Sequence, residues 1–102
     1  MVKTTQEFKR MPTITDAMLE ALRAQGFTGT VSDMQLQQGR LVSGLTEGSV
    51  ADCYRSYFSD LGYEGTLSDQ WYRWLGDNGF TGSLSDRKLA FWVAGGTLPP
   101  LP

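Results

Sequence analysis

Apolar residues gather in short clusters with helical spacing, and polar, glycine-containing links separate these clusters. In the first cluster, Leu22 follows Met18 by four residues and Leu19 by three, which places all three on one face of a helix. Similar clusters return along the chain. Together they predict five short helices, over about 16–25, 33–43, 50–61, 69–77 and 86–94.

The links repeat one eight-residue motif. Its three close copies are GFTGTVSD at 26–33, GYEGTLSD at 62–69 and GFTGSLSD at 79–86. A looser copy at 44–52 reads GLTEGSVAD, and TITD at 13–16 keeps only the second half. The closing aspartates stand at positions 16, 33, 52, 69 and 86, at spacings of 17, 19, 17 and 17 residues. A nearly fixed period of this kind predicts a repeat architecture.

Each link combines the end of one helix with the start of the next. Gly26 and its counterparts suit the left-handed conformation that ends a helix, and the aromatic residue after them (Phe27, Tyr63 or Phe80) is expected to fold back on that end. The predicted N-caps are Thr15, Ser32, Ser68 and Ser85, with the aspartate as the first helical residue. Where Ala51 replaces the hydroxyl, Ser49 or Asp52 is expected to cap. The apolar residue before each cap forms a hydrophobic staple. The links are therefore rigid elbows, in which only Thr81 and Gly82 are left free to contact a partner.

Alignment on the aspartates predicts which side chains face inward. The third and sixth positions after each aspartate lie on one side of a helix. The third position holds Leu19, Leu36, Arg55, Tyr72 and Leu89. The sixth position holds Leu22, Gly39, Phe58, Leu75 and Trp92. Arg55 and Gly39 break this apolar pattern. The predicted fold is all-α: a compact array of about five short helices joined by glycine elbows, with extended arms at both ends.

The predicted organisation has three parts. Residues 1–12 form an N-terminal arm or a simply disordered terminus, residues 13–96 form the helical repeat domain, and residues 97–102 form a proline-rich tail near polyproline II. Both ends are expected to act as arms that bind a partner. Their apolar side chains Phe8, Leu98 and Leu101 are candidate contacts.

The aromatic cluster Trp71-Tyr72-Arg73-Trp74 supplies the other candidate contacts. Four adjacent side chains do not all face one core on a helix, so we expect Trp71 or Trp74 to be partly exposed. Exposed aromatics beside an arginine are enriched at interfaces. The alternative is that neighbouring helices cover them all. The candidate partner-binding residues are thus Phe8, Trp71, Arg73, Trp74, Trp92, Leu98 and Leu101.

Composition argues against several functions. The 102 residues include no histidine and one cysteine, Cys53, which we expect to be buried. A Ser-His-Asp triad, an intrachain disulfide and a cysteine zinc site are therefore excluded. The net charge of −2 argues against nucleic acid and anionic membranes as partners. The aspartates are explained by helix N-termini, which favour anions. We expect no enzyme activity, no cofactor, no metal, no signal peptide and no membrane span.

The motif G-[FY]-x-G-[ST]-[VL]-S-D, followed by a short helix, resembles tandem repeats of bacteriophage structural proteins, often written GYTGTLND…FW. Residues 26–36, 62–75 and 79–92 carry the likeness strongly, and 13–22 and 44–58 carry it weakly. Serine here replaces asparagine before the aspartate, and both residues cap helices.

The resemblance implies a virion protein, made in the host cytoplasm. It would be a non-enzymatic adaptor, present in multiple copies, that binds other particle proteins of the capsid, neck, tail or tail fibre. The alternative is a module that binds a glycan or cell wall through exposed aromatics.

Overall fold

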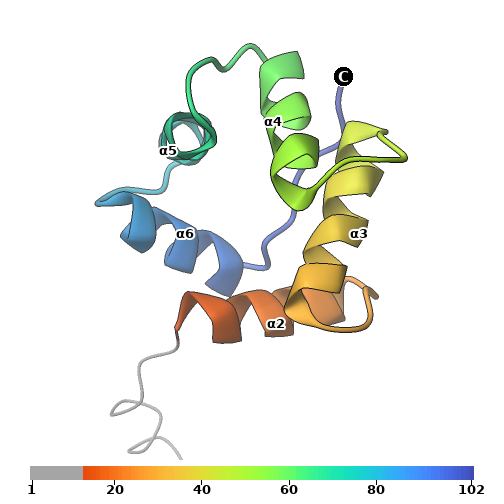
Figure 1. The fold of residues 1–102 in the computed structure, drawn as a ribbon. Coiled ribbons are helices and arrows are strands. Elements are labelled where there is room, and N and C mark those ends of the chain that lie inside the picture. Colours follow the sequence, from red (N-terminus) through yellow and green to blue (C-terminus); the bar gives the residue numbers. More distant parts are fainter. Residues whose placement is uncertain (1–12) are drawn as a thin grey trace, which may run out of the picture.

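The computed structural model describes residues 13–102, which form five α-helices and no strand (Figure 1). They are α2 (Ile14–Ala24), α3 (Val31–Ser43), α4 (Val50–Asp60), α5 (Leu67–Asp77) and α6 (Leu84–Val93). The predicted all-α class is confirmed. Each helix packs against its neighbours in sequence, and α2 also packs against α6. The array is therefore closed into a ring.

Every helix begins with the same capping box. In α5, Thr66 Oγ1 accepts a hydrogen bond of 3.1 Å from the Asp69 amide, and Asp69 Oδ2 accepts one of 3.1 Å from the Thr66 amide. The other N-caps are Thr13, Thr30, Ser49 and Ser83. The predicted caps Thr15, Ser32, Ser68 and Ser85 are wrong by two residues, and the expected alternative Ser49 is confirmed.

The N-caps lie two residues before the predicted positions because a capping box needs a reciprocal pair of hydrogen bonds. A hydroxyl three residues before the aspartate can exchange two hydrogen bonds with it, whereas the hydroxyl immediately before it cannot. Four of the five helices consequently start two residues earlier than predicted. The predicted staple residues, which are Ile14, Val31, Leu67 and Leu84, become the first helical residues and are half-buried against the core.

The helix ends match the expected glycine caps. At the end of α2, Gly26 has φ +94°, its amide donates to the Arg23 carbonyl at 2.9 Å, and the Phe27 amide donates to the Leu22 carbonyl at 3.2 Å. This is a Schellman motif, and it recurs at Gly62 and at Gly79.

The second glycine of each link is structural as well. Gly82 has φ +101°, and a Cβ there would lie 2.8 Å from Asp86 Oδ2. Gly82 therefore has a role inside the elbow that the sequence did not reveal.

The core is built from the same four positions of each repeat. Residues one, two, five and six after the aspartate are buried or half-buried in every helix. The sixth position is buried in all five repeats, as predicted. The third is not: Tyr72 and Arg55 are exposed, and the other three are only half-buried. A helix in a ring is covered from two sides, so its buried face is broader and is shifted by about one residue.

Gly39, which breaks the predicted pattern of inward-facing side chains, is explained by the packing of α3 on α4. A Cβ on Gly39 would lie 2.9 Å from the Cβ of Cys53. The missing side chain lets the two helices approach closely, and Cys53 is fully buried at the contact, as expected.

The chain after α6 turns back across the ring instead of projecting from it (Figure 1). Gly95 and Gly96 form another Schellman motif. The Gly96 carbonyl then accepts hydrogen bonds from Gln38 Nε2 at 2.8 Å and from Gln25 Nε2 at 3.2 Å. Further along, the Tyr57 hydroxyl donates to the Pro99 carbonyl. Residues 97–102 form neither helix nor strand, and Leu98 is buried among the helices, so this segment is part of the folded domain and does not form the predicted arm.

Candidate functional site

The three tryptophans lie in the core and do not form an exposed platform. Trp71, Trp74 and Trp92 are 4%, 5% and 3% exposed. The prediction that Trp71 or Trp74 is partly exposed is wrong, and the alternative, coverage by neighbouring helices, holds. Because α5 is flanked by α4 and α6, both side chains pack against Phe58 and Phe91, at centroid distances of 4.8 to 5.7 Å.

Tyr72, predicted to point inward, is 43% exposed. Its ring lies 3.7 Å from the guanidinium carbon of Arg87. Arg87 also donates to the Tyr72 carbonyl at 2.9 Å and to the Gly82 carbonyl at 2.8 Å. This cation–π contact is a bridge between α5 and α6, and its role is structural.

The other candidate residues are scattered. Arg73 is exposed on the outer side of α5. The pKa of nearby Asp69 is lowered, first by its hydrogen bonds with Thr66 and to a lesser degree by Arg73. Leu98 is 6% exposed, and half-buried Leu101 packs against the same core. Phe8 lies outside the described residues. The structure therefore does not bring the predicted contacts together on one surface.

A hollow that sequence reasoning missed lies where the five helices converge. It has a volume of about 310 Å³, and each helix lines it with the second residue after its aspartate: Met18, Gln35, Tyr54, Trp71 and Lys88. Ile14, Val50 and Leu67, from the first turns of three helices, add apolar walls. We call this site the central hollow.

Among residues 13–102, Lys88 is the only charged residue that lines the central hollow. Its Nζ lies 5.5 Å from the centre of the Trp71 ring, within the range of a weak cation–π contact. Burial lowers the pKa of Lys88, and among residues 13–102 no carboxylate offsets that shift. Two uncharged polar side chains, Gln35 and Tyr54, also line it, and the Tyr54 hydroxyl already donates to Gln38 Oε1 at 2.8 Å. The hollow thus presents one half-buried cation on an apolar and aromatic wall.

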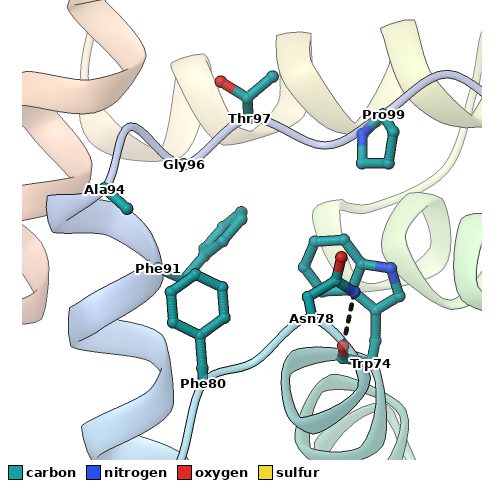
Figure 2. Close-up of a pocket in the computed structure, with 8 residues that line it drawn as sticks. All are labelled: Trp74, Asn78, Phe80, Phe91, Ala94, Gly96, Thr97 and Pro99. Carbon is teal, nitrogen blue, oxygen red and sulfur yellow. Dashed lines mark hydrogen bonds between the residues drawn. The ribbon is translucent and has the colours of Figure 1, made fainter.

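A second cleft, of about 260 Å³, lies between α5, α6 and the C-terminal segment (Figure 2). Trp74, Phe80 and Phe91 supply aromatic walls, and Thr97 and Pro99 border it from the returning chain. The Asn78 side chain donates to the Trp74 carbonyl at 2.8 Å, which caps the end of α5. Within the part of the chain that the structure describes, no charged residue lines this cleft. Its neutral walls give less indication of a ligand than the central hollow does.

A signal for the hollow was present in the sequence. The second position after the aspartate reads Met, Gln, Tyr, Trp and Lys, so that a lone cation follows four residues without charge. The prediction that the third and sixth positions face inward leaves the second position outside the core and therefore does not reveal this pattern.

The described part of the chain offers no metal site and no membrane span. Among residues 13–102, no three potential metal ligands of the His, Cys, Asp and Glu type are grouped together. None of the five helices has both the length and the apolar character that crossing a bilayer requires. The five motif aspartates are engaged in capping boxes.

Comparison of the sequence with protein-family models and with curated proteins, and of the fold with solved structures, gave no match.

Proposed function

We propose that this chain is a non-enzymatic structural protein of a bacteriophage particle. It would act as a small helical adaptor that binds other particle proteins of the capsid, neck, tail or tail fibre. The resemblance of its repeat motif to those of virion proteins supports the biological setting. The central hollow, with Lys88 at its wall, is the observation that carries the binding role.

Partial burial of Lys88 is unfavourable for the fold. A lysine at a core-facing position loses hydration, and within the described residues it gains no carboxylate in return. A methionine at this position would fill similar space without that cost. Residues that break a local rule without a structural gain are expected at functional sites. A contact surface for another protein accounts for this cation.

Burial of the tryptophans removes the support for the glycan alternative, because stacking on a sugar needs an accessible aromatic face. The alternative still makes a separate prediction, which is retention of the purified protein on cell walls. The adaptor proposal predicts no such retention, so the two are distinguishable in one pull-down.

The test of the adaptor proposal is the composition of purified particles. Particles from cells that make this protein would be separated on a density gradient, and the chain would be quantified by mass spectrometry against a major particle protein. We expect it to co-migrate with particles at a fixed copy number. Recovery only in the soluble fraction, with none in intact particles, would overturn the proposal.

A further inference from the structure

The central hollow has the size and the chemistry of a small peptide-binding site. Its volume of about 310 Å³ is at the lower end of the range for ligand pockets, enough for one or two side chains. Met18 and Val50 line it with apolar atoms, and Trp71 and Trp92 line it with aromatic ones. An occupant must therefore bring apolar surface to replace water on these walls.

Lys88 decides the charge of the occupant. Its ammonium group carries hydrogen-bond donors and no acceptor, and the Trp71 ring 5.5 Å away provides only weak compensation. An anion seated there would gain a charge-assisted hydrogen bond in a partly dehydrated site, where such bonds are stronger than in water. A neutral or cationic occupant would leave the ammonium group without this partner.

We propose that the central hollow binds an acidic, apolar peptide segment of a neighbouring particle protein, with a carboxylate of that segment paired to Lys88. This inference specifies the partner of the proposed adaptor and rests on that proposed function, since the neighbour is taken to be a particle protein. Adjacent apolar side chains of the segment would pack against the half-buried Ile14, Val50 and Leu67. The half-buried Gln35 side chain at the same wall offers an amide for the segment's backbone.

The first test uses the isolated protein and a defined probe. The probe is an acetylated, amidated Leu-Leu-Glu tripeptide, and its Leu-Leu-Gln counterpart is the neutral control. Binding would be followed by NMR through the Lys88 ammonium and tryptophan indole signals. We expect the acidic peptide to bind at least about tenfold more tightly than the neutral one. This ratio corresponds to the contribution of one hydrogen bond to a charged group.

Three variants distinguish the effect of the Lys88 charge on binding from an effect on folding. Lys88→Met should weaken binding of the acidic peptide by about tenfold or more, while Lys88→Arg should keep most of it. Arg55→Met, which removes an exposed cation outside the hollow, should change nothing. Lys88→Met is expected to be at least as stable as the wild type, so lost binding would not reflect lost folding. Equal binding by wild type and Lys88→Met would overturn the proposal.

The second test identifies the occupant in intact particles. A carbodiimide joins an amine to a carboxylate through an amide bond with loss of water, so it reports a Lys88–carboxylate pair directly. We expect a cross-link from Lys88 to an aspartate, a glutamate or the terminal carboxylate of another protein. A cross-link to Glu7 of the same chain would overturn the inference, because the chain's own N-terminal segment would then fill the hollow.

The two tests also distinguish the inference from the function on which it rests. Lys88-dependent peptide binding by a chain that is absent from particles would reject the particle role and leave the peptide chemistry in place. A chain present in particles whose Lys88 forms no cross-link, and whose peptide binding ignores Lys88→Met, would reject the inference alone.

Discussion

The Tyr54 hydroxyl donates a hydrogen bond of 2.8 Å to Gln38 Oε1 inside the protein, where both side chains are almost fully buried. Gln38 in turn donates through Nε2 to the Gly96 carbonyl at 2.8 Å. One glutamine thereby connects α4, α3 and the returning C-terminal segment. Buried polar groups of this kind stabilise a fold only when each has its partner.

The first prediction concerns this network. Tyr54→Phe leaves Gln38 Oε1 buried without its donor, and we expect the free energy of unfolding to fall by about 1–3 kcal/mol. Gln38→Met should also destabilise, but the double variant should lose less than the sum of the two, because both partners are then removed. Urea unfolding provides the measurement. Tyr72→Phe, at an exposed tyrosine, is the control. Strict additivity of the two core changes would contradict the coupling.

The second prediction concerns the contact of α3 with α4. On helix propensity alone, Gly39→Ala should stabilise α3 by about 1 kcal/mol. Because the new Cβ would lie 2.9 Å from the Cβ of Cys53, we expect a net loss of about 1–3 kcal/mol instead. Gly76→Ala is the comparison variant, because its Cβ would meet only the end of the Arg87 side chain, which can move aside at the cost of its hydrogen bond to the Tyr72 carbonyl. The midpoint temperatures of thermal unfolding should shift by clearly different amounts in the two variants. Equal shifts would contradict the close packing at Gly39.

The third prediction distinguishes two hydroxyls of one link. Thr66→Ala removes the N-cap of α5 and should cost about 1 kcal/mol, whereas Ser68→Ala, inside the first turn and exposed, should be close to neutral. Chemical unfolding of both variants measures the difference. A larger effect at Ser68 would restore the cap expected from sequence.

The fourth prediction concerns the C-terminal segment. Leu98→Ala should destabilise by about 2–4 kcal/mol, because Leu98 is buried among the helices and a cavity would remain. Leu101→Ala, at a half-buried position, should cost less. If residues 97–102 were instead a free arm, both changes would leave the unfolding midpoint in urea unchanged.

The fifth prediction concerns alkaline pH. Burial raises the pKa of Tyr57 to about 12 from the ordinary 10.0, and burial also raises the pKa of Tyr54. Above pH 10 the unfolded chain releases these protons while the folded chain keeps them, so stability must fall as pH rises. Tyr57→Phe should make that fall shallower. Urea midpoints over a pH series test this, and parallel curves for wild type and variant would contradict it.

Local structure was well predicted from sequence. The Gly26-Phe27 pair and its counterparts specify a helix end through backbone geometry alone, and the period of the aspartates specifies the helix count. The caps were misplaced because Thr66 and Ser68 are chemically equivalent. Only the two-way exchange of hydrogen bonds with Asp69 distinguishes them.

Long-range structure was not predictable in the same way. Ring closure depends on contacts such as that of Gln25 with the Gly95 carbonyl at 3.0 Å, 70 residues apart, and no local pattern encodes such a pair. Burial of Trp71 and Trp74 needs α4 and α6 to pack on both sides of α5, and Leu98 is buried only because the C-terminal segment returns across the ring. The site was missed for this reason, because the central hollow exists only once five separate helices meet.

The contact of α2 with α6 sets this fold apart from open solenoids in how it can evolve. An open solenoid accepts a duplicated repeat at either end, since each unit touches only its neighbours. Here a sixth helix would have to separate α2 from α6 and would pull Gln25 away from the Gly95 and Gly96 carbonyls that it binds. Gain or loss of a single motif is thus expected to break the fold, so the helices of residues 13–102 should tolerate change by substitution and not by duplication of a repeat.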